Sequence, residues 1–170
     1  MVFTGSKSVG EFLYREHGLN KANRHGEIKP VVAEMGGKNP ILVTNNCELD
    51  ETVAGALYSC FAHAGQKCSA ASRIIIHKEV KDNFLSRFLK ASENLKIGKA
   101  DDFSTYINPL ISENEKQRVL DQIKQLRGEV EKVGGRVLLD LSIQERGGHF
   151  VGPVIVEIPP AAASKNQAMF

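Results

Sequence analysis

Apolar runs alternate with amphipathic stretches along most of the 170-residue chain. Short apolar runs bounded by glycine, proline or polar residues are typical of strands. They predict strands over residues 2–4, 31–34, 39–44, 73–77, 136–139 and 150–158. Longer segments repeat apolar residues at helical spacing and predict helices over residues 7–17, 50–64, 78–96 and 112–128. The alternation of the two patterns favours an α/β fold.

Local signals predict the ends and surroundings of several elements. The three successive isoleucines at 74–76 indicate a strand that is buried on both faces. We expect Asp50 to cap the helix that follows it. Ser112 and Glu115 form a capping-box pattern, and the helix that they begin is expected to end near Gly128.

Composition places the chain among globular proteins, with 42% hydrophobic and 25% charged residues. Its length suits one ordinary domain with a real core. A formal net charge of +2, with both signs mixed, offers no large basic field, so nucleic acid is not an expected partner. No apolar run approaches the roughly 20 residues that cross a bilayer, and we expect no transmembrane segment.

The three cysteines, Cys47, Cys60 and Cys68, are odd in number and show no Cys-x-x-Cys spacing. That pattern argues against a disulfide framework and against a zinc site, and it favours a reducing compartment. We therefore expect no metal site and a cytoplasmic location. Cys60 falls on the apolar face of its predicted helix, as a small core residue would.

Cys68 differs from the other two because it lies in a turn of small and polar residues, between Lys67 and Ser69. An exposed thiolate there could act as a nucleophile, and Lys67 would lower the pKa of the thiol if its side chain pointed inward. The alternative is a buried structural cysteine. His63 is expected on the solvent side of its helix, so a Cys–His hydrolase is the weaker enzymatic interpretation.

Glu34 ends an apolar run and precedes the Gly36-Gly37 turn, which is expected to join two short strands. Glycines there allow a flat ligand to approach the backbone closely. Partial desolvation would raise the pKa of the carboxyl group and make Glu34 a better general base. The alternative is a solvated glutamate beside an ordinary turn, and the pattern alone favours that alternative.

Residues 5–10, Gly-Ser-Lys-Ser-Val-Gly, have part of the spacing of a phosphate-binding loop. A Walker loop requires Lys and then Ser or Thr after its second glycine, whereas Glu11 follows Gly10. A phosphate-loop nucleotide hydrolase is therefore disfavoured. A strand followed by Gly5, Ser6 and a helix could still hold a pyrophosphate at the helix start, and the alternative is an ordinary helix cap.

Three motifs in order resemble those of the aldehyde dehydrogenase superfamily: residues 3–10, residues 34–38 and residues 65–68. The interval of 68 − 34 = 34 positions is also similar to the family's spacing between base and nucleophile. Residues 68–73 and 150–156 are most similar to the 1-pyrroline-5-carboxylate dehydrogenase branch. That branch also occurs fused to proline dehydrogenase in proline-utilisation proteins.

The resemblance implies the chemistry of two residues. Cys68 would attack an aldehyde to form a thiohemiacetal, and its backbone N–H would donate to the oxyanion. Glu34 would activate the water that hydrolyses the thioester. In the 1-pyrroline-5-carboxylate branch the aldehyde would be L-glutamate 5-semialdehyde, oxidised to L-glutamate in proline catabolism. A dehydrogenase for another aldehyde remains an alternative.

The resemblance also implies a cofactor, NAD or else NADP, and the residues around it. Gly5 and Ser6 would lie at the cofactor pyrophosphate, and Met35 with Gly36 beside the nicotinamide. Ser69 would contact the carboxylate of the substrate. The fold implied is a mostly parallel sheet flanked by helices.

Residues 1–36 resemble the end of the NAD-binding domain, and residues 37–170 resemble part of the catalytic domain. We expect a piece of a larger protein, truncated at both ends, that binds NAD weakly and is inactive by itself. The whole protein is expected to be a homo-oligomer. A non-catalytic module that associates with itself is the alternative from another functional class.

Overall fold

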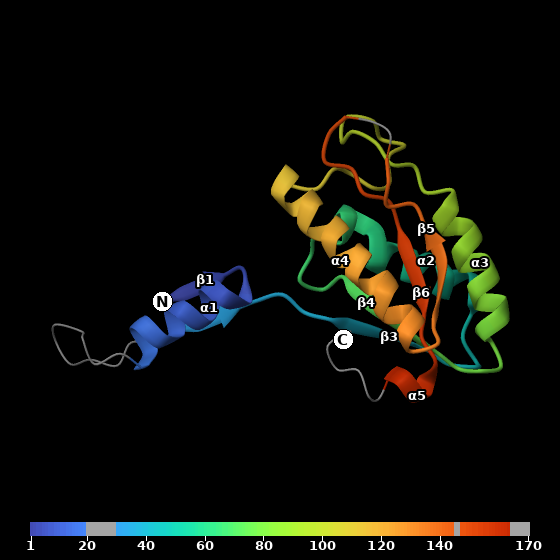
Figure 1. The fold of residues 1–170 in the computed structure, drawn as a ribbon, viewed down its shortest axis with the longest axis horizontal. Coiled ribbons are helices and arrows are strands. Elements are labelled where there is room, and N and C mark those ends of the chain that lie inside the picture. The colour runs from blue at the N-terminus through green and yellow to red at the C-terminus, as the bar shows by residue number, and fades with distance from the viewer. Residues whose placement is uncertain (20–29, 145–146, 164–170) are drawn as a thin grey trace. The chain divides into compact units, whose positions relative to one another are not determined.

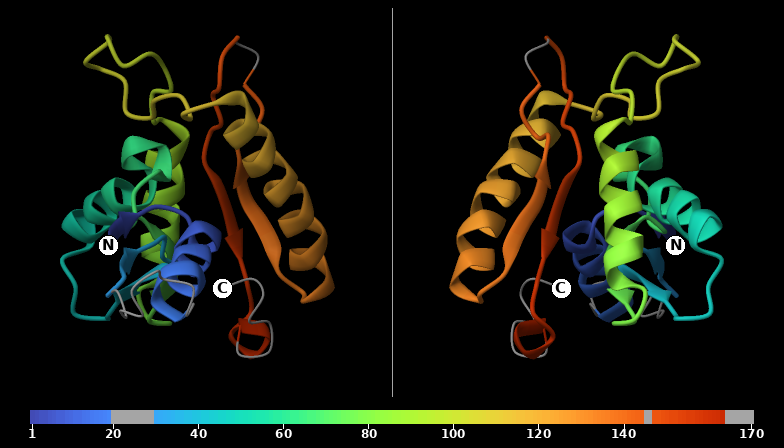
Figure 2. Two further views of the ribbon diagram at one scale, coloured as in Figure 1. Left: turned by 90° about the vertical axis from the view of Figure 1, so that its left-hand side faces the viewer. Right: turned by 90° about the vertical axis from the view of Figure 1, so that its right-hand side faces the viewer.

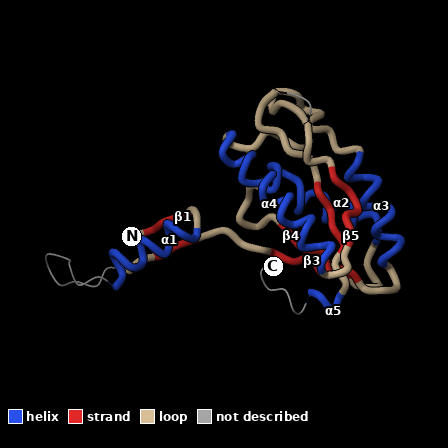
Figure 3. The backbone as a smooth tube through the Cα atoms, viewed as in Figure 1, coloured by secondary structure: helices blue, strands red, loops and turns tan. Residues whose placement is uncertain are grey.

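The structure of the chain is a computed structural model that describes residues 1–19, 30–144 and 147–163. The described chain forms two compact units. The first comprises Met1–Gly37 together with Lys67–Ser69, and the second comprises Lys38–Gln66 and the chain from Ala70 onward. Figures 1 and 3 show the helices and strands of both units. None of the described helices is long and apolar enough to span a membrane.

The first unit contains one parallel pair of short strands and a helix. Its elements are β1 (Val2–Thr4), α1 (Lys7–Leu13), the π-helical segment η1 (Tyr14–Leu19) and β2 (Val32–Glu34). β1 and β2 run parallel, with Val2 opposite Val32 and Thr4 opposite Glu34. The predicted helix over residues 7–17 forms, but its second half is π-helical.

The second unit begins with two parallel strands joined by a helix. Its first elements are β3 (Asn39–Val43), α2 (Leu49–Phe61), the 3₁₀ turn η2 (Ala62–Gly65), β4 (Ala71–Ile76) and α3 (Lys81–Glu93). A parallel pair requires a crossover connection, which α2 supplies. The core between these elements contains Val43, Val53, Ala56, Phe84 and Phe88. The rings of Phe84 and Phe88 stack with their centroids 5.3 Å apart.

The rest of the second unit is a long helix and an antiparallel strand pair. Its elements are α4 (Glu113–Lys132), β5 (Arg136–Asp140), β6 (Val154–Glu157) and the short helix α5 (Pro160–Ala163). Figure 2 shows α3 and α4 on opposite sides of the β5–β6 pair, and both helices contact β5. Glu157 on β6 joins α3 to the strand pair, because it pairs with Lys81 on α3 and accepts from Arg136 Nε on β5 at 2.7 Å.

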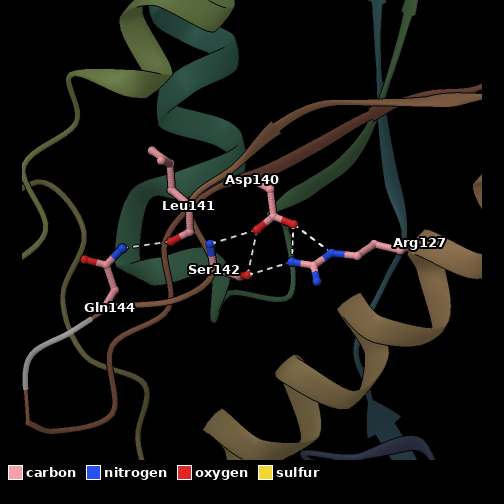
Figure 4. A network of polar contacts seen from close by, with 5 residues as sticks. All are labelled: Arg127, Asp140, Leu141, Ser142 and Gln144. Atoms are coloured by element: carbon pink, nitrogen blue, oxygen red, sulfur yellow. Dashed lines mark hydrogen bonds and ion pairs between the residues drawn. The ribbon is translucent and has the colours of Figure 1, made fainter.

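Arg127 fixes α4 to the end of β5 (Figure 4). Its Nε donates to Asp140 Oδ2 at 2.8 Å, and Ser142 donates to Asp140 Oδ1 from its Oγ at 2.6 Å. Burial would raise the pKa of Asp140, but the hydrogen bonds from Ser142 and Arg127 outweigh it and hold the pKa below its usual value. Ser142 is buried, so this network is a structural fastening between helix and strand.

The α/β class is confirmed, but the described strands form three separate two-stranded sheets. Two pairs are parallel and one is antiparallel. The expected burial of the isoleucines on both faces is wrong. Ile75 and its neighbour across the pair, Leu42, are 56% and 70% exposed, whereas Ile74 and Ile76 pack against the core. The β3–β4 pair therefore buries one face.

Two predicted helix ends also differ from the structure. Glu48 rather than Asp50 occupies the N-cap of α2, and Asp50 pairs with Arg87. α4 continues through Gly128 because Val130, two positions later, is fully buried. It ends where Gly134 adopts a φ of 71°, a conformation that glycine adopts without strain.

Candidate active site

Cys68 lies in the turn Lys67–Ser69, between η2 and β4, and it is exposed. The expectation of a solvent-accessible thiol is therefore confirmed. Cys47 and Cys60 are partly buried, and burial raises the pKa of the Cys60 thiol to about 11. Of the three cysteines, Cys68 is the one exposed to a reagent or substrate at the surface.

The segment before Cys68 has an uncommon backbone conformation. His63, Ala64 and Gly65 adopt φ values of 55°, 55° and 70° in succession. A left-handed conformation costs about 1 to 2 kcal/mol for a residue with a Cβ, so the first two residues are strained. The rest of the structure must hold this turn in place.

Gln66 holds the strained turn through its side chain. Its Nε2 donates to His63 O at 3.2 Å and to Pro109 O at 3.4 Å. Its Oε1 accepts from Ile111 N at 2.9 Å. The residue thus fastens η2 to the loop before α4. The sequence pattern did not indicate a role for Gln66, although this residue belongs to the Gly-Gln-Lys-Cys motif.

Glu34 is the last residue of β2 and is exposed. The solvated glutamate that the sequence pattern favours is therefore confirmed, and the partial desolvation considered beside it is not present. Its backbone carbonyl accepts a hydrogen bond from Gly5 N at 3.0 Å. This bond places the ends of β1 and β2, and with them Gly5 and Glu34, beside each other.

Ser6 begins α1 as its N-cap, and its Oγ accepts from Val9 N at 3.4 Å. The helix-cap interpretation is confirmed for this residue. Ser6 Oγ also lies 3.2 Å from Ser8 Oγ. The predicted pyrophosphate contact of Gly5 and Ser6 stays a prediction.

Met35 packs on the helix that follows Ser6. A Cβ placed on the buried Gly10 would lie 2.7 Å from Met35 Sδ, so a larger residue at position 10 would displace this flexible side chain. In the described part of the chain, no atom beyond the two neighbouring residues lies within 4 Å of the corresponding position on Gly36. The backbone of Gly36 is therefore open to a flat group.

The first unit contains all the predicted site residues: Gly5, Ser6, Glu34, Met35, Gly36, Cys68 and Ser69. The turn Lys67–Ser69 groups with Met1–Gly37 although it follows Glu34 by more than 30 positions in the sequence. The structure thus brings the predicted nucleophile and the predicted base into one compact unit.

Other reactive groups do not form a competing centre in the described part of the chain. His149 Nδ1 pairs with Glu113 Oε2 at 2.9 Å, and His17, His63 and His77 are exposed. His25 lies outside the described residues. The described residues contain no group of His, Cys, Asp and Glu that could hold a metal ion.

Residues 1–169 match the aldehyde dehydrogenase family. The chain belongs to this family. The resemblance that the three motifs carry is thereby confirmed, and the α/β fold is that of an aldehyde dehydrogenase.

Similar aldehyde dehydrogenases are much longer than this chain. The 1-pyrroline-5-carboxylate dehydrogenase of Bacillus licheniformis is 31% identical, over 100% of this chain and 32% of the relative. The malonate-semialdehyde dehydrogenase of Lacticaseibacillus casei is 33% identical, over 91% of this chain and 30% of the relative. The chain spans about a third of the length of these relatives.

A solved structure shows the same fold. The 1-pyrroline-5-carboxylate dehydrogenase from Thermus, with bound NAD, aligns with a TM-score of 0.82 at 33% identity. The alignment covers 95% of this chain and 30% of the Thermus chain.

Proposed function

We propose that this chain is the nucleophile-bearing part of an NAD-dependent aldehyde dehydrogenase that oxidises L-glutamate 5-semialdehyde to L-glutamate. One observation carries the proposal: Cys68 is the exposed cysteine, and its turn belongs to the same compact unit as Glu34. The family supplies the reaction class, and the names of several relatives supply the aldehyde.

The reaction begins at the Cys68 thiolate. Its sulfur forms a bond to the aldehyde carbon, and the carbonyl oxygen takes up the negative charge, which the backbone N–H of Cys68 stabilises. NAD, when bound, supplies the acceptor for the hydride of the thiohemiacetal. Glu34 then takes a proton from water that attacks the thioester. The carbon–sulfur bond breaks, which releases the carboxylic acid and restores the Cys68 thiolate.

The residues near β1 and β2 fit a dinucleotide. The open backbone at Gly36 suits the nicotinamide ring, with Met35 beside it. Gly5 and Ser6, at the start of α1, suit the pyrophosphate. We assign residues 1–36 to the NAD-binding domain and residues 37–170 to the catalytic domain. We expect weak binding of NAD, or of NADP, and little turnover from this chain alone, because its relatives are about three times as long.

Ser69 is proposed to contact the substrate carboxylate, since it is exposed and adjacent to Cys68. Both names given to the relatives, 1-pyrroline-5-carboxylate and malonate semialdehyde, denote carboxylate-bearing compounds. A carboxylate-bearing aldehyde is therefore the supported substrate class. We place the reaction in the cytoplasm, where thiols stay reduced.

The test measures alkylation of the Cys68 thiol rather than enzymatic turnover. Cys68 is alkylated with iodoacetamide in the presence of L-glutamate 5-semialdehyde, malonate semialdehyde or butanal, and labelling is read by peptide mass spectrometry. We expect the carboxylate-bearing aldehydes to slow labelling of Cys68 more than butanal does. Ser69→Ala should remove that preference and leave the effect of butanal unchanged. Equal protection by all three aldehydes would contradict the proposed substrate class.

A second candidate, self-association, is favoured by the exposed side chains of Leu42 and Ile75 on β3–β4. A second copy could cover this apolar pair, in line with an oligomeric whole protein. Light scattering on the wild type and on Leu42→Thr/Ile75→Thr tests it. A dimer that the double variant dissociates would support the candidate, and a monomeric wild type would contradict it.

A further inference from the structure

The β3–β4 pair is irregular where its two strands begin. Asn39 lies opposite Ala71 and Pro40 opposite Arg73, with a register shift between the two positions on β3. Pro40 has no N–H and cannot donate to a strand ladder. The backbone ladder is therefore weakened at this end of the pair.

Two side chains cross between the strands at this irregular end. Asn39, on β3, donates from Nδ2 to Ala70 O, just before β4, at 3.1 Å. Arg73, on β4, donates from Nη2 to Lys38 O, just before β3. Each strand thus holds the backbone that leads into the other. We call these two bonds the reciprocal clamp.

The reciprocal clamp acts at the two points where the chain enters the second unit. Lys38 directly follows Gly37, four positions after Glu34, and Ala70 directly follows Ser69, two positions after Cys68. Short connections of two to four residues leave little slack between the clamp and each of these residues.

From this arrangement we infer that Asn39 and Arg73 are positioning residues, which fix the nucleophile Cys68 and the base Glu34 relative to each other through the backbone. The inference rests on the proposed function, since it takes the roles of Cys68 and Glu34 from it. Neither positioning residue needs to touch the substrate.

The clamp is not required for the strand register itself. Ile41, Leu42 and Val43 pair in sequence with the three isoleucines of β4, and His77 N donates to Val43 O at 2.8 Å at the far end. Ile41, Ile74 and Ile76 also pack against the core. Loss of the clamp should therefore leave the strand pair formed and release only its starting ends.

The experiment measures whether the charge of Glu34 changes the rate at which the Cys68 thiol is alkylated. The rate of Cys68 alkylation by iodoacetamide at neutral pH is compared with and without Glu34→Gln. In the wild type, Glu34→Gln should speed alkylation by roughly threefold or more, because it removes the negative charge that the proposed function places beside the nucleophile. In Arg73→Met and in Asn39→Asp this response should shrink toward onefold. Lys67, the charge adjacent to Cys68 in the sequence, is unchanged in every variant.

Three controls separate positioning from general damage. Arg87→Met removes an exposed arginine that pairs with Asp50 elsewhere in the second unit, and it should keep the full response to Glu34→Gln. Arg73→Lys retains a cationic donor and should restore part of the response. Thermal unfolding shows which variants are folded, and Asn39→Asp, which changes no side-chain volume, serves if Arg73→Met unfolds.

The outcomes distinguish a failure of the positioning role of Asn39 and Arg73 from a failure of the proposed function. A wild-type response that persists in folded Arg73→Met and Asn39→Asp would overturn the clamp and leave the proposed function standing. No response to Glu34→Gln in the wild type would overturn the pairing of nucleophile and base, and the clamp with it.

Discussion

Gln66 Oε1 accepts a hydrogen bond from Ile111 N at 2.9 Å, and this contact joins the turn before Cys68 to the loop before α4. The two residues lie 45 positions apart in the sequence. The same Gln66 side chain bonds back to His63 within the strained turn. The conformation of η2 therefore depends on a contact with a distant loop, not on local sequence alone.

Gln66→Ala should destabilise the second unit by about 1 kcal/mol, because it removes three hydrogen bonds to backbone groups that water at these exposed positions replaces only in part. The free energy of unfolding in urea measures the loss. Gln117→Ala is a matched control, since Gln117 Nε2 donates to Asp121 Oδ1 on the same helix at an exposed position, and it should change stability by less than about 0.5 kcal/mol. Equal effects in the two variants would contradict the role given to Gln66.

Ala64→Gly should stabilise the protein, because Ala64 adopts a φ of 55°. Relief of the left-handed strain is worth about 1 kcal/mol, less the entropy that glycine adds to the unfolded chain. Ala54→Gly, at an exposed position inside α2, should have the opposite sign, with a loss of about 1 kcal/mol. Thermal midpoints of both variants give the comparison. A loss of stability in Ala64→Gly would contradict the left-handed turn.

Gly152→Ala should severely destabilise the protein. Gly152 is buried, and a Cβ there would collide with the Leu141 carbonyl and lie 2.9 Å from Leu141 Cβ. Backbone atoms cannot move aside cheaply, so a loss of roughly 3 kcal/mol or more is expected. Gly147→Ala is the control, since no atom of the described residues beyond its chain neighbours lies within 4 Å of its Cβ position. Circular dichroism at increasing urea concentration measures both, and a tolerant Gly152→Ala would contradict the packing.

Asp140 should make stability depend on pH in the acidic range. Its pKa in the folded protein is held low by Ser142 and Arg127 despite burial. The folded carboxyl group thus binds protons less readily than the unfolded one, so its contribution is complete above roughly pH 4 and is lost as the pH falls further. Asp140→Asn should lower the free energy of unfolding at neutral pH by about 1 kcal/mol.

The difference between wild type and Asp140→Asn should shrink as the pH falls below roughly 4. Ser142→Ala removes a donor to Asp140 Oδ1 and should shift the loss to higher pH. A difference that stays constant from neutral to acidic pH would contradict the assigned network.

The sequence predicted the positions of helices and strands better than the burial of their residues. Strand Val2–Thr4 and the Ser112 cap are confirmed, because residue identity within a few positions decides them. The predicted helix end near Gly128 was wrong, because the burial of Val130 outweighs the weak helix propensity of one glycine. Exposure of Ile75 depends on which face of β3–β4 the helices cover, and three identical apolar residues cannot indicate that.

The candidate site shows the same division between local and distant causes. Exposure of Cys68 was predictable from its polar turn. Exposure of Glu34 agrees with the solvated alternative that the sequence pattern favoured, whereas its grouping with Cys68 depends on tertiary contacts that the pattern does not show. The bonds of Gln66 to Pro109 and Ile111 join segments that no periodicity relates.

Site-resolved alkylation of the three cysteines, with and without L-glutamate 5-semialdehyde, tests the central claim most directly. The account predicts that iodoacetamide labels Cys68 much faster than Cys60, whose thiol has a pKa of about 11. It also predicts that the semialdehyde slows labelling at Cys68 and leaves Cys47 and Cys60 unaffected. Labelling of Cys68 that is slow, or that the semialdehyde does not change, would contradict its assignment as the nucleophile.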